Sequence, residues 1–166
     1  MLHVCAEYGQ ETLFKYFLSE GKADITKKNF IEETPLHLAA REGKFPLIQH
    51  MIQTMKLNIE EQTADGWTPL IYCAFNGFQS CLEYLLRNNA KINHQDKLKR
   101  TALHWAMRCN QAEMAGTLVK MGADYELVDF ESKQAVDLAM EAGHRDLAQS
   151  IQQMWGQQKK SKAAPK

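Results

Sequence analysis

Histidine and cysteine are the residues of this sequence that could support catalysis or bind a metal ion. A thiolate beside an imidazole forms a nucleophile and base pair, and both side chains can ligate zinc. The chain has six histidines and four cysteines. The cysteines form no CxxC pair, which argues against a zinc ribbon and against a thioredoxin-type redox site. Chemistry of this kind therefore requires a fold that brings distant residues together.

Phosphate, calcium and metalloprotease sites also depend on fixed spacings, and these spacings are missing. The sequence has no P-loop, no GxGxxG turn, no HExxH pair and no Asp-rich calcium loop. Asp65-Gly66 is typical of a tight turn. We therefore expect no cofactor, no metal and no catalytic residue.

The charge balance further limits the partners. Twenty basic and twenty acidic residues give a formal net charge of zero, which argues against a general binder of nucleic acid or of membrane surfaces. Outside residues 157–166 there are 16 basic and 20 acidic residues, and that segment itself adds Lys159, Lys160, Lys162 and Lys166. No apolar run is long enough to span a bilayer, and the first residues of the sequence do not show the pattern of a leader peptide. We expect a cytoplasmic protein with reduced thiols, with nuclear localisation through Lys159–Lys162 as a weaker alternative.

A seven-residue pattern recurs along the chain at a nearly constant interval. It reads TPLHLAA from Thr34, TPLIYCA from Thr68 and TALHWAM from Thr101, with weaker copies after Met1 and from Gln134. The first Leu or Val of each copy falls at positions 2, 36, 70, 103 and 136, so the periods are 34, 34, 33 and 33 residues. A glycine-type turn, an apolar helical run and a second turn follow each copy. A fixed period of this length indicates a repeat architecture.

The pattern resembles the ankyrin repeat, which consists of a hairpin turn, a Thr-Pro-Leu-His-x-Ala-Ala helix, a glycine turn, a second helix and a Gly-Ala-Asp turn. The resemblance implies an all-α solenoid of stacked helix-turn-helix units joined by β-hairpin fingers. The expected units are about 1–29, 30–62, 63–95, 96–128 and 129–156, followed by a basic, flexible tail at 157–166. The expected helix pairs are 2–8 and 11–20, 35–42 and 45–54, 69–76 and 79–88, 102–109 and 112–121, and 135–142 and 145–155.

Elementary helix physics supports this assignment independently. A Thr at the N-cap accepts from otherwise unpaired backbone N–H groups, and a Pro at the first helical position has no N–H to satisfy. In the third unit, Leu82, Leu85 and Leu86 form one amphipathic face of the second helix. A single unit cannot bury such a face alone, so the units must stack.

The repeat also separates the residues that could have been catalytic. His3, His37 and His104 occupy the fourth position of the pattern in different units, where the resemblance implies a hydrogen bond to backbone across the hairpins. Cys5 and Cys73 occupy a slot for small buried residues. We therefore expect a non-enzymatic protein.

The two ends of the array differ. Unit five replaces apolar residues of its second helix by Gln149, Gln152 and Gln153, as a terminal cap requires. Unit one has no Thr-Pro start, yet its second helix is apolar. We therefore expect Met1 to be an internal start within a longer protein or to lie against another chain.

In ankyrin repeats the finger tips and the exposed ends of the first helices line a concave groove that binds proteins. In nearly every unit here, those positions carry a large apolar residue, and several carry a basic one, a combination typical of binding hot spots. The candidate partner-binding residues are Tyr8, Phe30, Ile31, Arg41, Trp67, Phe75, Leu98, Arg100, Arg108, Phe130 and Lys133. The alternative is that the finger aromatics merely pack against the next finger.

The predicted function is a protein-interaction scaffold or adaptor. Its partner is a protein or peptide with an apolar anchor near Trp67 and Phe75 and an acidic segment near Arg100 and Arg108, with no nucleic acid and no membrane insertion. Two alternatives remain: a structural subunit of a large assembly, and a regulatory module of a longer, enzymatic protein.

Overall fold

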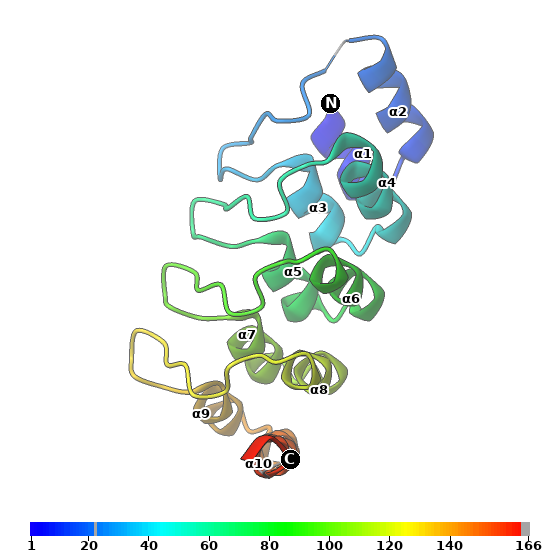
Figure 1. Ribbon diagram of the computed structural model, residues 1–166. Coiled ribbons are helices and arrows are strands. Elements are labelled where there is room, and N and C mark those ends of the chain that lie inside the picture. Colours follow the sequence, from blue (N-terminus) through cyan, green and yellow to red (C-terminus); the bar gives the residue numbers. More distant parts are fainter. Residues whose placement is uncertain (22, 164–166) are drawn as a thin grey trace.

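The computed structural model describes residues 1–21 and 23–163, and these residues form a curved stack of helix pairs (Figure 1). The helices are α1 (Leu2–Tyr8), α2 (Glu11–Ser19), α3 (Pro35–Arg41), α4 (Phe45–Met55), α5 (Pro69–Asn76), α6 (Gln79–Arg87), α7 (Ala102–Arg108), α8 (Ala112–Lys120), α9 (Ala135–Glu141) and α10 (Arg145–Ala163). The expected all-α solenoid is thereby confirmed. Within the described residues, no helix is long and apolar enough to cross a membrane.

The first helix of each pair packs on the first helix of the next unit, and the second helices form an outer row (Figure 1). Close approach is possible because small residues line the inner contacts: Ala39, Ala74 and Ala106 are fully buried. Leucines such as Leu82 and Leu85, also fully buried, fill the layer between the two rows. Stacking thus buries the apolar faces that a single unit would leave open.

The histidines of the pattern join neighbouring units, as expected from the resemblance. His37 Nδ1 accepts from the backbone N–H of Thr34 at 3.1 Å, and its Nε2 lies 2.9 Å from the carbonyl oxygen of Glu61. Since Nδ1 accepts, the proton resides on Nε2 and is donated to the next finger. His104 repeats the arrangement with Thr101 at 3.2 Å and with the Lys133 carbonyl at 3.3 Å.

The fingers that join the units are tight hairpin turns. In the third finger the N–H of Asp96 donates to the carbonyl of Arg100 at 3.0 Å, and in the fourth that of Asp129 donates to Lys133 at 2.8 Å. Within the described residues, β pairing is limited to an isolated bridge between Val128 and Gln134. The expected hairpins are therefore present, with almost no extended strand.

Backbone hydrogen bonds also connect each finger to the preceding one. The N–H of Ala64 donates to Ile31, that of Lys97 to Asp65 and that of Phe130 to Leu98, at 2.9, 3.0 and 2.9 Å. These donors and acceptors occupy equivalent repeat positions. The finger tips consequently form one continuous row along the concave side.

The last helix is longer than the sequence predicts, since it was expected to end at residue 155. Helix α10 continues to Ala163, because the segment is rich in helix-favouring Gln, Lys and Ala and its first part is anchored. Trp155 stacks on Tyr125 with ring centroids 5.5 Å apart, and Lys159 Nζ lies 2.6 Å from a carboxylate oxygen of Glu126. Residues 164–166 and the side chain of Lys162 lie outside the described residues.

The N-terminal end presents an uncovered apolar face. Leu13 in α2 is 48% exposed, whereas Leu47, at the equivalent position of the next unit, is 1% exposed. Val4 in α1 is likewise exposed, while its counterpart Leu38 is buried. Unit one therefore keeps residues suited to the interior of the array.

Candidate protein-binding surface

Four aromatic residues form a cluster at the centre of the concave side, and Trp67 is its hub. The Trp67 ring centroid lies 4.9 Å from that of Tyr72, 5.3 Å from Phe75 and 4.8 Å from Trp105. Phe75 also contacts Trp105 at 5.7 Å. These contacts are tilted or edge-on, the geometries that aromatic pairs prefer. Trp67 and Phe75 are both half-buried, so they pack against neighbouring rings while part of each side chain remains open to solvent.

Two hollows flank Trp67 along the row of fingers. One, of about 240 Å³, is lined by Ile31, Thr63, Asp65, Trp67 and Tyr72. The other, of about 330 Å³, is lined by Asp65, Trp67, Asp96, Lys97, Leu98 and Trp105. Trp67 and Asp65 line both, so together they form the wall between the two hollows.

The remaining apolar candidates stand out on the fingers and on α1. Phe30 and Phe130 are fully or largely exposed, and Tyr8, Ile31 and Leu98 are exposed as well. Large apolar side chains in such positions are costly in water and are a common mark of interaction surfaces.

Most of the basic candidates are already paired within the protein. Arg100 Nε donates to Asp129 at 3.0 Å, and the guanidinium lies 5.3 Å from the Trp105 ring. Arg41 contacts carboxylates of Glu7, Glu33 and Glu42, and Lys133 contacts those of Glu131 and Glu141. Arg108, in contrast, is exposed and makes no ion pair within the described residues. Arg108 is thus the candidate cation most available to a partner.

Buried acceptors hold the fingers in shape. One carboxylate oxygen of Asp96 accepts from the N–H groups of Leu98 and Arg100, and its other oxygen accepts from the indole of Trp105 at 2.8 Å. Asp129 plays the equivalent role in the fourth finger. Burial opposes ionisation of Asp129, but hydrogen bonds from the Lys133 N–H, Arg100 and the Glu131 N–H hold its pKa below the usual value.

Two members of the aromatic cluster, Tyr72 and Trp105, were not among the sequence candidates. Both occupy the variable position of the seven-residue pattern, one repeat apart. That equal spacing was the signal that could have revealed them, because it places both rings on the same side of successive first helices. Asp96 and Asp129 likewise lie one repeat apart, at the base of successive fingers.

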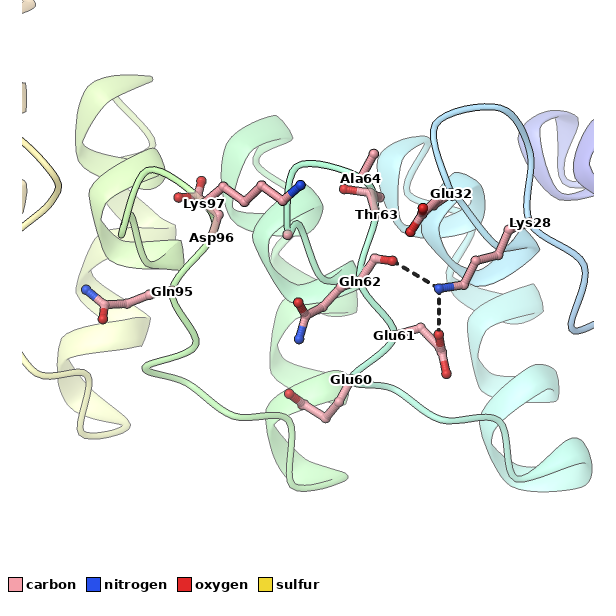
Figure 2. Close-up of a pocket in the computed structure, with 11 residues that line it drawn as sticks. Lys28, Glu32, Glu60, Glu61, Gln62, Thr63, Ala64, Gln95, Asp96 and Lys97 are labelled. Atoms are coloured by element: carbon pink, nitrogen blue, oxygen red, sulfur yellow. Dashed lines mark hydrogen bonds and ion pairs between the residues drawn. The ribbon is translucent and has the colours of Figure 1, made fainter.

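The histidines, cysteines and carboxylates in the described part of the chain do not gather into a metal site. Groups of three or more His, Cys, Asp or Glu residues suited to a metal are absent there. A polar hollow of about 530 Å³ does extend over three fingers, and in it Lys28 Nζ contacts Glu61 and the Gln62 carbonyl (Figure 2). The charged side chains that line it are of mixed sign.

Comparison with known proteins agrees with the fold. A family profile of three ankyrin repeats matches residues 2–96, and a single ankyrin-repeat profile matches residues 99–130. The chain is 31% identical over 138 residues to neurogenic locus notch homolog protein 1 of Homo sapiens and 32% identical over 131 residues to inversin of Mus musculus. These alignments cover 83% and 78% of this chain but only 5% and 12% of the relatives. Ankyrin repeats are protein-interaction modules without catalytic activity of their own, and this chain belongs to the ankyrin-repeat family.

Proposed function

We propose that the chain is a non-enzymatic scaffold that binds a protein or peptide in its concave groove. The observation that carries the proposal is the aromatic cluster around Trp67, which lies at the centre of the array and opens onto two hollows. Rigid aromatic side chains supply much contact area with little loss of conformational entropy. Arg108 adds a cation suited to an acidic group of the partner. Free cysteines are in keeping with a reducing, cytoplasmic location.

The test compares proteins captured from cells by three forms of the full chain. The Trp67→Ala, Phe75→Ala double variant removes the centre of the groove, and Met121→Ala removes an exposed apolar residue that follows α8 in the outer row. We expect a common set of proteins bound by the wild type and by Met121→Ala but lost from the double variant. Thermal unfolding of all three forms verifies that they are folded. Equal capture by all three would contradict the proposal.

A second candidate role, as a subunit packed within a larger assembly, is favoured by the apolar face at the N-terminal end. Leu13 lies there in a position that the other four units bury, and Val4 lies in one that units two, four and five bury. Light scattering coupled to size-exclusion chromatography tests this role on the purified chain. We expect association that a Leu13→Glu variant abolishes, and a chain that is monomeric and binds nothing through this face would exclude the role.

A further inference from the structure

We infer that the groove recognises a proline-rich segment in the polyproline II conformation, with apolar residues at positions i and i+3 and an acidic residue toward unit four. This inference rests on the proposed function, because it specifies the partner of the same groove. It is carried by three features: the distance between the two hollows, the shape of the wall between them, and the unpaired charges beside them.

The distance follows from the repeat itself. The hollows lie in successive gaps between fingers, so their separation is set by the spacing of the stacked first helices, about 8–10 Å for packed helices. A polyproline II helix rises about 3.1 Å per residue with three residues per turn, so i and i+3 lie on one side about 9 Å apart. In a β-strand, side chains on one side are about 6.7 Å apart, and the i+3 side chain points the opposite way.

The wall between the hollows disfavours an α-helical ligand. On an α-helix, i and i+7 are also about 10.5 Å apart, but residues i+3 and i+4 lie between them on the same side. These residues would collide with Trp67, which three neighbouring rings hold in place. In polyproline II the two intervening side chains point away from the wall, so the ligand can straddle it.

The chemistry of the wall also suits proline-rich chains, which dock against aromatic-lined grooves in other proteins. Within the described residues, the indole N–H of Trp67 donates no hydrogen bond, whereas that of Trp105 is held by Asp96. A polyproline II segment keeps all of its carbonyl oxygens free of internal hydrogen bonds. The Trp67 indole is therefore available to orient such a ligand.

The charges beside the hollows determine on which side of its apolar pair the ligand carries an acidic residue. Lys97, Lys99 and Arg108 all belong to unit four, are exposed, and make no ion pair within the described residues. In unit two, by contrast, Arg41 is surrounded by carboxylates. An acidic residue of the ligand consequently lies on the unit-four side of its apolar pair.

The experiment is a selection from a random twelve-residue peptide library against the full chain, followed by calorimetric titration of the synthesised best binder. We expect enriched peptides to contain proline, an apolar pair spaced i and i+3, and an acidic flank. Inserting one residue between the apolar pair should weaken binding at least tenfold, because only one hollow can then be filled. Replacing the acidic residue by lysine should weaken binding several-fold.

Matched variants locate the binding. Ile31→Ala and Leu98→Ala each remove an exposed side chain from one hollow, and each should weaken binding about tenfold without altering the unfolding temperature. Phe130→Ala, an exposed residue outside both hollows, should leave the affinity unchanged.

The outcomes separate this inference from the proposed function. Peptides that bind the groove through Ile31 and Leu98 but lack the i and i+3 spacing, or that bind as helices, would overturn the inference and leave the proposed function standing. Failure of the library to yield any peptide that depends on Ile31, Leu98 or Trp67 would count against both.

Discussion

The guanidinium of Arg100 donates from Nε to a carboxylate oxygen of Asp129 at 3.0 Å, joining the third finger to the fourth. Both side chains are largely buried, at 11% and 1% exposure. Arg100 is a residue expected from the sequence to face an acidic partner, and in the folded protein that acid is its own neighbour.

Replacing Arg100 should therefore reduce stability. Arg100→Ala leaves the Asp129 carboxylate buried without its cation, and breaking a buried pair costs about 3 kcal/mol. Urea unfolding measures the loss. Arg108→Ala is the control, because Arg108 is exposed and its removal should change the free energy of unfolding by less than about 0.5 kcal/mol. Equal stability of the two variants would contradict the prediction.

Asp96 should be a second determinant of stability. Asp96→Ala removes the acceptor for two backbone N–H groups and for the Trp105 indole, and we expect a loss of about 3 kcal/mol. Asp96→Asn should cost less, because Asn29 accepts the equivalent two backbone bonds in the first finger. Chemical denaturation followed by tryptophan fluorescence checks the order. If the alanine and asparagine variants are equally stable, Asp96 does not act through these bonds.

Stability should fall as the pH is lowered from about 7 to 5. Burial is the main cause of the lowered pKa values of His37 and His104. The unfolded chain therefore binds more protons than the folded one below the ordinary histidine pKa of about 6.5, and protonation favours unfolding. The contribution of the two neutral histidines to the free energy of unfolding is therefore fully present above that pKa, and it is lost as the pH falls below it.

Urea midpoints at pH 7 and pH 5 measure this effect. A His37→Gln, His104→Gln variant should show a smaller difference between the two midpoints, although it is less stable at pH 7. His50→Gln is the control, since that side chain bonds Thr54 in an exposed position. If the wild type and the double variant lose the same stability between pH 7 and pH 5, the two histidines do not cause the pH dependence.

Cys109 should be the thiol that reacts in the folded protein. Cys5, Cys73 and Cys81 are buried, whereas Cys109 is partly exposed at the end of α7. Burial raises the pKa of Cys109, so its reaction with a chromogenic disulfide reagent at pH 7 should be slow. We expect one thiol per chain to be titrated before unfolding and four afterwards. A Cys109→Ser variant should show none before unfolding.

The repeat made most of the fold predictable. Because Thr34, Thr68 and Thr101 recur at a nearly constant interval, they identify the starts of three first helices. The observed α3, α5 and α7 begin directly after them. The segment beyond residue 156 was less predictable, because its composition does not reveal the stacking of Trp155 on Tyr125 from the preceding finger.

The candidate surface was predictable only in part. Exposed residues such as Phe30 and Phe130 follow directly from their place at a finger tip. The pairing of Arg100 with Asp129 could not be predicted in this way. Nothing in the sequence distinguishes a basic finger residue that is free to bind a partner from one that pairs with the next finger. Side-chain packing between units decides this, and the period alone does not encode it.

The row of hydrogen bonds between finger tips gives the groove a direction. Each finger after the first donates an N–H to a carbonyl of the finger before it. The row of bonds therefore ends in unlike groups. The first finger has the N–H of Phe30 at the position equivalent to the Ala64 donor. The last finger has the carbonyl of Glu131 at the position equivalent to the Leu98 acceptor. The row of fingers is therefore polar along the array, with a donor facing the N-terminal helix pair and an acceptor facing the C-terminal helix pair.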